Sequence, residues 1–454
     1  MENLLFKNIR ISFLAQLSSI VVSVGMGLVL PKFLSVENYG YWQLFVTYSV
    51  CFETLLFGMP NGFFLKNAGK TNNDYDYLKT SFFVLMIINI SIGIIVILFT
   101  NNASIESIVY YWIGIAVIII NSGTFYSYIL RTENDVAFDC IAIIILNLSI
   151  LLGLCTVFLL NIINVEIVIG IYVLSFLIRD VLLLWRKRVL FLAKLKFTDN
   201  FFKEFSYDSK IGIKTLLIDY TNILMFGIFR LICKNEMGVT LFSMLSFALS
   251  LVILAINFVN QVGLSILPSL RQLDETSVKE AYIKLRNFTS NLFVALMLTY
   301  KPAIFILSHW LPKYIDSFFY ILLLFPLIIF DGKMQTIFSL FLKMLRKESL
   351  LLKINMIYFV SSIVAFLFVI RFTNNIKYVV LLILIFSFIR STIVESIISR
   401  IININGFGKK IFLEFATSIV FLGSNCSDGW IAWFYFAVFD ALVLCLNMKK
   451  CKII

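Results

Sequence analysis

The sequence predicts an all-α polytopic membrane protein, built as two six-helix lobes around a central cavity with an additional C-terminal helical hairpin. Of the 454 residues, 60% are hydrophobic and 14% are charged, and the mean hydropathy is +0.96. A water-soluble protein of this length would need more polar residues to cover its surface. Apolar runs of roughly 20 residues, long enough to cross a bilayer as a helix, follow one another along the chain. The longest interruption, a basic stretch at residues 186–210, falls after six of these runs.

The first two runs are predicted to form a hairpin. In "GLVLPKFLSVENYGYWQLF", Gly27 to Phe45, one apolar run stops at Pro31 and the next opens with Tyr41 and Trp42. Amphipathic rings favour the membrane interface, so the chain is expected to leave the bilayer at Pro31 and to re-enter it at the aromatic pair.

Twelve spans and a weaker terminal pair are predicted, which gives 12–14 transmembrane helices. The N-terminal lobe, 1–185, contains the runs 11–30, 41–65, 80–99, 108–130, 138–160 and 165–185. The C-terminal lobe, 211–402, contains the runs 211–232, 239–267, 291–308, 318–342, 354–370 and 378–399. The extra C-terminal hairpin, 403–454, contains the runs 411–423 and 430–446, of which the first is short and could be re-entrant rather than spanning.

The basic stretch 186–210 is interpreted as a cytoplasmic linker between the lobes. Its aromatic residues alternate with lysines: Phe197, Phe201, Phe202 and Phe205 with Lys194, Lys196 and Lys203. Basic residues alternating with bulky apolar ones are typical of a helix that lies in the membrane interface. We therefore expect this segment to lie along the cytoplasmic membrane surface.

Loop charges predict the orientation. Lys and Arg in short loops stay on the cytoplasmic side, and here every second loop is basic. The basic side contains, among others, Lys66, Lys79, Arg131, "RKRVLFLAKLKF", Lys279, Lys284 and Arg286, whereas the other side carries few cations, with Lys234, Arg371 and Lys377 as exceptions. Both termini are therefore predicted to be cytoplasmic, which requires an even number of spans.

Membrane topology also explains the net charge of +12, so no nucleic-acid partner is expected. The seven cysteines show no CxxC pairing and mostly fall inside apolar runs, which indicates small core residues rather than a metal site. No cofactor is predicted.

Two stretches resemble a known family. "GLVLPKFLSVENYGYWQLFVTYSV" and "FGMPNGFFLKNAGK" are similar to the corresponding segments of Wzx-type O-antigen and polysaccharide flippases, an oligosaccharide flippase family of the multidrug/oligosaccharidyl-lipid/polysaccharide exporter superfamily. The span count and the break after six spans agree with that family over nearly the whole chain.

The resemblance implies a carrier of undecaprenyl-diphosphate-linked oligosaccharide repeat units. Such a carrier moves its substrate from the inner to the outer leaflet of the bacterial cytoplasmic (inner) membrane, for assembly of surface polysaccharide such as O-antigen, lipopolysaccharide or capsule. The implied partners are the lipid-linked oligosaccharide, membrane lipid, a polysaccharide polymerase and a chain-length regulator.

Two other functions were weighed. An ion-coupled multidrug exporter of the same superfamily would share the architecture. A membrane enzyme of polysaccharide assembly, a polymerase or an acyltransferase, is less favoured, because the chain has one histidine, His309, and no long outer loop. No catalytic residue is predicted, and we expect a transporter rather than an enzyme.

Ionisable residues far from the ends of a span are candidate functional residues, because a charge at the bilayer centre costs roughly 2.5–3.5 kcal/mol on insertion scales. Six such residues are predicted to bind substrate in the cavity: Lys301, Arg390, Asp331, Lys333, Asp219 and Glu53. Arg179 and Asp180 lie nearer an interface and are secondary candidates, since snorkelling toward water explains their position equally well.

Lys301 and Arg390 are the predicted cations of the cavity. Pro302 follows Lys301 inside a span and frees a backbone carbonyl that needs a polar neighbour, which suits a helix lining a wet cavity. The alternative for Lys301 is a side chain that snorkels toward His309. Arg390 lies farther from either end of its span, which favours cavity lining.

The four acidic and basic residues that remain have open alternatives. Asp331 and Lys333 are two residues apart, on nearly opposite faces of a helix, so they reach one site only if Gly332 permits local unwinding. Alternatively, they make ion pairs between helices. Glu53 and Asp219 could be counter-ions to the cations or proton-binding groups.

Overall fold

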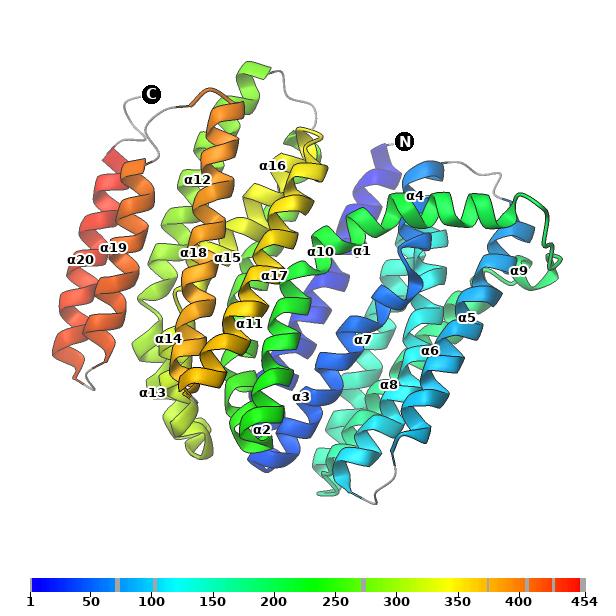
Figure 1. Cartoon of the computed structure of the whole chain (residues 1–454), viewed down its shortest axis with the longest axis horizontal. Coiled ribbons are helices and arrows are strands. Elements are labelled where there is room, and N and C mark those ends of the chain that lie inside the picture. The colour runs from blue at the N-terminus through cyan, green and yellow to red at the C-terminus, as the bar shows by residue number, and fades with distance from the viewer. Residues whose placement is uncertain are drawn as a thin grey trace. The chain divides into compact units, whose positions relative to one another are not determined.

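The computed structural model describes residues 2–69, 74–100, 104–270, 275–373, 375–404, 408–426 and 429–449. Within these ranges every regular element is a helix and no strand occurs (Figure 1). The predicted fold class, an all-α polytopic membrane protein, is confirmed. By its internal packing the chain divides into two compact units. Unit 1 comprises residues 1–234 and 238–243, and unit 2 comprises residues 235–237 and 244–454.

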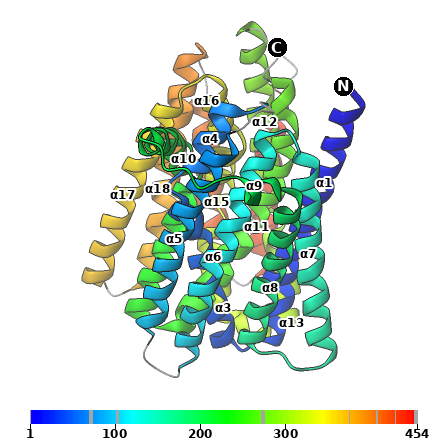
Figure 2. The same ribbon diagram turned by 90° about the vertical axis from the view of Figure 1, so that its right-hand side faces the viewer.

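Unit 1 is a bundle of long helices with two interruptions near its N-terminus. Its elements are α1 (Glu2–Val24), a π-helical turn (Gly25–Val29), α2 (Leu30–Phe33), α3 (Val36–Cys51), a 3₁₀ turn (Phe52–Leu56), α4 (Met59–Asn67), α5 (Tyr75–Leu98), α6 (Ile105–Thr132), α7 (Val136–Leu159), α8 (Val165–Arg186), α9 (Val189–Leu192) and α10 (Phe201–Met237). The first half of α10 runs crosswise to α5 and α6 in Figure 1 and is seen nearly end-on in Figure 2.

Helix starts in unit 1 follow local sequence signals. The side chains of Ser35, Asp74 and Ser104 accept hydrogen bonds from the first backbone N–H groups of α3, α5 and α6. Such caps satisfy donors that have no partner inside the helix. Helix α6 packs against α5 and α8, and α7 packs against α1 and α8, so the apolar runs bury one face each against their neighbours.

Unit 2 is also helical, but the helices between residues 300 and 344 are short. After α11 (Val239–Leu270) it contains α12 (Glu275–Met297), α13 (Tyr300–Trp310), a 3₁₀ turn (Pro312–Ser317), α14 (Phe318–Leu324), α15 (Leu327–Lys333), a π-helical turn (Met334–Phe338), α16 (Ser339–Met344), α17 (Glu348–Thr373), α18 (Ile376–Ile401), α19 (Gly408–Asn425) and α20 (Trp430–Lys449). Helix α18 packs against α14, α15 and α17, and α12 packs against α15 and α20.

Nine helices among the described residues are long and apolar enough to cross a membrane, and the number rises to 11 if each of two bent pairs is one span. The bent pairs replace two predicted spans. Residues 291–308 belong to α12 and α13, which meet at 45°, and residues 318–342 belong to α14, α15 and α16, with a 54° bend after α14.

The predicted span 41–65 is not one helix either. Phe57 and Gly58 have φ values of +50° and +70°, in the left-handed region, where a right-handed helix cannot continue. The span is therefore split into α3, a 3₁₀ turn and α4. The sequence reasoning missed this break because apolar content alone does not show where a helix stops.

The predicted linker is partly helical. Residues 201–210 are the first turns of α10, the helix that also contains the predicted span 211–232. The division of the chain by packing falls at residues 235–243, whereas the sequence places the junction of the lobes at 186–210. The division into two six-helix lobes with an extra hairpin stays a prediction.

Candidate functional site

Glu53 lies at the break between α3 and α4, in the 3₁₀ turn Phe52–Leu56. Its carboxylate accepts a hydrogen bond from the Tyr128 hydroxyl at 2.9 Å and another from the Tyr220 hydroxyl. Tyr128 accepts in turn from Asn61 Nδ2 at 2.6 Å. The half-buried carboxylate is thus held by uncharged donors from α6 and α10, and it makes no ion pair with the described residues.

A pair of buried asparagines lies at the same break, and one of them, Asn121, satisfies its backbone. Asn121 Nδ2 donates to the Phe52 carbonyl at 2.8 Å and to Asn89 Oδ1 at 2.6 Å. Both asparagine side chains are fully buried. Non-helical backbone at membrane depth is tolerated where protein groups or water satisfy it, and here α5 and α6 supply the partners.

Close contact between α4 and α10 fixes the geometry of the break. A Cβ atom on Gly212 would lie 1.8 Å from the Gly58 carbonyl oxygen and 2.4 Å from the Gly62 nitrogen. Only glycine fits there, because both atoms belong to the backbone and cannot move aside. Tyr220 lies two turns farther along α10 and so reaches Glu53.

Asp219 lies beside Tyr220 but is exposed. It is within electrostatic reach of the Tyr128 and Tyr220 hydroxyls. The sequence left open whether Glu53 and Asp219 are counter-ions or proton-binding groups, and it did not predict that they lie near the same two tyrosines. Their role in binding stays a prediction.

Arg179 and Asp180, the secondary candidates, are buried on α8. Asp180 Oδ2 accepts from Ser122 Oγ on α6, and Arg179 Nη2 lies 3.5 Å from Asp180 Oδ1. The guanidinium carbon lies 5.0 Å from the centre of the Phe176 ring. The Arg179 side chain is thus packed within unit 1 rather than extended toward water, which favours a role in helix packing over snorkelling.

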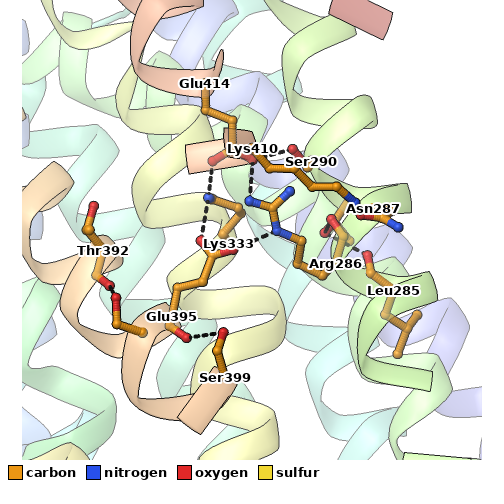
Figure 3. Close-up of polar contacts among 12 residues, drawn as sticks. Leu285, Arg286, Asn287, Ser290, Lys333, Thr392, Glu395, Ser399, Lys410 and Glu414 are labelled. Atoms are coloured by element: carbon orange, nitrogen blue, oxygen red, sulfur yellow. Dashed lines mark hydrogen bonds and ion pairs between the residues drawn. The ribbon is translucent and has the colours of Figure 1, made fainter. Parts of the chain in front are cut away.

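Unit 2 contains a buried network of four charges, shown in Figure 3. Arg286 on α12 contacts Glu395 Oε1 on α18 through Nε at 2.7 Å and Glu414 Oε1 on α19 through Nη2 at 3.1 Å. Lys333 Nζ on α15 lies 3.2 Å from Glu395 Oε2 and also bonds Glu414 Oε2. All four side chains are at most 2% exposed.

The charges in this network balance, with two cations and two anions. Ser290 adds a third donor to Glu414. Buried ions are tolerated when each is paired and hydrogen-bonded, and removal of one partner typically costs 3–5 kcal/mol. The network therefore joins four helices, α12, α15, α18 and α19, into one unit and ties the first helix of the C-terminal hairpin to the rest.

A second polar group includes Asp331, two residues before Lys333 on α15. Asp331 Oδ2 accepts from Ser387 Oγ at 3.1 Å, and Ser387 Oγ lies 3.2 Å from the Tyr358 hydroxyl. The Arg390 guanidinium carbon lies 4.6 Å from the centre of the Tyr358 ring. Arg390 is 3% exposed, so its charge is enclosed by α15, α17 and α18 side chains.

Asp331 and Lys333 thus belong to different groups, as expected from their opposite faces on the helix. Local unwinding at Gly332, the condition under which both side chains could have reached one site, does not occur, because α15 remains helical through Lys333. Gly332 instead makes room for Phe293, whose ring atom Cζ would lie 2.5 Å from a Cβ at this position.

Lys301 lies in the first turn of α13, directly after the 45° bend between α12 and α13. Its side chain is partly exposed and Pro302 is exposed. A sharp bend before Pro302 agrees with the expected disturbance of the helix by proline. The predicted contribution of Lys301 and Arg390 to a cavity stays a prediction.

Three residues of the charge network were missed by sequence reasoning. Arg286 was assigned to a cytoplasmic loop, and this is wrong, because α12 begins at Glu275 and buries Arg286 two to three turns inside. Glu395 and Glu414 were passed over because they lie near the ends of predicted spans. A search for opposite charges at similar depth on neighbouring apolar runs could have paired them with Lys333.

Comparisons with solved structures identify the fold. No protein-family model matches the sequence, and no curated protein sequence matches it. Among solved structures, "Lipid II flippase MurJ, inward closed conformation" is similar over 97% of this chain and 98% of its own, with a TM-score of 0.69 and 14% identity. A multidrug resistance MATE family transporter of the MOP superfamily, in an inward-facing conformation, is similar over 88% of this chain and 98% of its own, with a TM-score of 0.64 and 10% identity.

A third similar structure is a MOP superfamily transporter from Pyrococcus furiosus, with a TM-score of 0.51 and 12% identity, covering 87% of this chain and 93% of its own. MOP abbreviates the multidrug/oligosaccharidyl-lipid/polysaccharide exporter superfamily. The chain has the MOP fold. This fold is the one expected from the sequence resemblance. It is the fold of a multi-pass membrane protein, and the similar structures are flippases and transporters.

Proposed function

We propose that this protein is a flippase for undecaprenyl-diphosphate-linked oligosaccharides. It moves the repeat unit from the inner to the outer leaflet of the bacterial cytoplasmic membrane, where a polymerase and a chain-length regulator assemble O-antigen or capsule. Both termini lie in the cytoplasm in this proposal, and the protein performs no covalent chemistry.

The observation that carries the proposal is the extent of the similarity to the lipid II flippase. It includes 97% of this chain, with the higher of the two TM-scores, whereas the similarity to the MATE transporter leaves out about a tenth. A lipid-linked sugar carrier therefore accounts for more of the chain than a drug exporter does.

The substrate chemistry explains why charges inside the bundle would be useful. A diphosphate must lose much of its water to pass the bilayer centre, and fixed cations reduce that cost. The membrane potential itself favours outward movement, by roughly 2.3 kcal/mol per negative charge per 100 mV. Lys301 and Arg390 are the proposed cations, with Asp331, Asp219 and Glu53 as polar groups of the path. Lys333 already bonds two carboxylates, so we assign it to holding helices together.

A complementation assay tests the proposal. A bacterial strain lacking its own oligosaccharide flippase, but supplied with the matching sugar-assembly enzymes, should regain surface polysaccharide when this chain is expressed. Lectin accessibility of the lipid-linked repeat on intact spheroplasts should rise in parallel. The control is the Arg390→Gln variant at matched membrane protein level.

The multidrug exporter remains the second candidate, because the MATE similarity extends over most of the chain at a TM-score of 0.64. The same strains grown with cationic drugs separate the two. Drug resistance conferred without any gain of outer-leaflet sugar would replace the flippase proposal with the exporter.

A further inference from the structure

The segment that follows α8 is attached to unit 1 by its backbone. We call residues 188–203 the strap. The Ala193 carbonyl accepts from Lys79 Nζ at 2.7 Å, the Lys194 N–H donates to Asp76 Oδ1 at 2.8 Å, and the Lys196 N–H donates to Thr80 Oγ1 at 3.0 Å. The first turns of α5 thus bind three successive parts of an irregular segment.

Two buried side chains anchor the ends of the strap. Leu190 and Phe201 are each 2% exposed and belong to the core of unit 1. The Phe201 ring lies 5.8 Å from the Tyr77 ring of α5, between centroids. Because both ends of the strap are buried and its middle is hydrogen-bonded, the strap has a fixed orientation. The side chains on its outer face therefore cannot turn inward to become buried.

The exposed face of the strap combines large apolar side chains with cations. Val189 is 51% exposed, Leu192 83%, Leu195 48%, Phe197 55% and Phe202 66%. The exposed cations between them are Arg188, Lys194, Lys196 and Lys203, and none makes an ion pair with the described residues. The strap has one acidic residue, Asp199, and Glu204 follows it, so positive charge is in excess.

The strap lies at the end of unit 1 where basic residues gather. The Glu133 carboxylate, at the end of α6, accepts from the Tyr75 hydroxyl at 2.8 Å and pairs with Lys187 just before the strap. The start of α5, the end of α6 and the end of α8 therefore meet at this end, which sequence reasoning assigns to the cytoplasm. Figure 1 shows α9 beside α5 at this end.

We propose that the strap is a docking surface for anionic phospholipid. Bulky apolar side chains enter the boundary between headgroups and acyl chains, while Lys and Arg contact the headgroup phosphates. The apolar side chains alone would suit any membrane, but the four cations make the contact dependent on negative surface charge. The hydrogen bonds to Asp76, Lys79 and Thr80 fix the backbone of the strap before lipid binds. Binding therefore costs little further conformational entropy.

The test uses the full-length protein, with its seven cysteines replaced by alanine and a bimane label on Leu195→Cys, in lipid nanodiscs. Quenching by brominated acyl chains reports insertion of the label. We expect strong quenching in discs that contain phosphatidylglycerol and weak quenching in discs of phosphatidylcholine alone. Salt raised from about 0.1 M to 1 M shortens the Debye length from about 10 Å to 3 Å and should reduce the quenching.

A triple variant, Lys194→Gln/Lys196→Gln/Lys203→Gln, should lose the dependence on anionic lipid. The ratio of inserted to free strap should fall about fivefold for each cation removed. The matched control is Arg346→Gln/Lys347→Gln/Lys353→Gln, which removes two exposed cations between α16 and α17 and one near the start of α17, and it should behave like the parent.

A further variant, Asp76→Ala/Thr80→Val, removes the acceptors of the Lys194 and Lys196 N–H groups and should weaken insertion even in anionic discs. Equal quenching in neutral and anionic discs would overturn the proposal. An equal loss of the dependence on anionic lipid in the control variant would also overturn it. So would a label that is quenched only by aqueous iodide, because the strap would then face water and be available to a soluble acidic partner.

Discussion

In unit 1 the Glu53 carboxylate is held by two tyrosine hydroxyls, whereas in unit 2 Glu395 and Glu414 are held by Arg286 and Lys333. Both arrangements stabilise acidic groups inside an apolar bundle. The neutral donors leave Glu53 half-buried, with no ion pair to any residue that the structure describes, at a point where the helix is already broken. The ion network is fully buried and electrically neutral.

This difference separates two uses of intramembrane charge. The Glu53 carboxylate can separate from the two tyrosine hydroxyls at the cost of two hydrogen bonds. Glu53 is therefore suited to exchanging partners. A carboxylate that leaves the four-charge network exposes two buried cations, so that network is suited to holding helices together. Depth in a predicted span does not distinguish the two.

Removal of Lys333 should have the largest effect. Lys333→Met leaves two buried glutamates with one arginine, and we expect a loss of about 3–5 kcal/mol in the free energy of unfolding. Thermal unfolding in a fixed detergent at matched concentration measures it. The double variant Lys333→Met/Glu414→Leu restores neutrality and should recover at least half of the loss. If the loss of unfolding free energy in the double variant equals the sum of the losses in the two single variants, the four charges do not act together.

The break in unit 1 should be most sensitive to a methyl group on α10. Gly212→Ala forces a Cβ into the Gly58 and Gly62 backbone, and we expect a loss of about 3 kcal/mol from overpacking. Gly227→Ala, on the same helix, places its Cβ in ordinary contact, 3.5 Å from Thr47 Cγ2, and should be neutral or stabilising by about 0.5–1 kcal/mol. Similar unfolding midpoints for the two variants would contradict the close approach of α4 and α10.

Glu53→Gln should be milder than either change. The amide keeps one oxygen for a tyrosine hydroxyl, so the expected loss of unfolding free energy is about 1.5 kcal/mol, the lower end for a hydrogen bond to a charged group. A double-mutant cycle with Tyr128→Phe measures the coupling between the two side chains. A loss as large as that of Lys333→Met would remove the distinction between the two regions.

The two proposed cavity cations, Lys301 and Arg390, should show the smallest effects, which we expect in export. Arg390→Gln and Lys301→Met should lower surface polysaccharide roughly tenfold, as expected for loss of one charged hydrogen bond. The matched variants Arg390→Lys and Lys301→Arg keep the charge and should retain most activity in the same complementation assay, at equal protein levels. Neutral variants that export normally would show that these cations do not serve transport.

The sequence predicted the fold class because composition and run length are set by the bilayer, which leaves few alternatives. It did not show the break at Phe57, because the residues that permit it are Gly58 and a distant partner, Gly212, 154 positions later in the chain. Nor did it show the ion network, since Arg286, Glu395 and Glu414 lie on three different helices. Contacts between helices depend on rotation about each helix axis, which a hydropathy pattern leaves open.

The four-charge network also has a consequence for the order in which the chain is made. Lys333 is synthesised 81 residues before its partner Glu414, a delay of roughly 4–16 s at ordinary translation rates of about 5–20 residues per second. For the first 62 of these residues Arg286 and Lys333 have neither Glu395 nor Glu414 to pair with in the bilayer. Helices α12 and α15 should therefore complete their insertion only when α18 and α19 emerge. The order of these helices in the sequence thus delays membrane integration of this half of the protein.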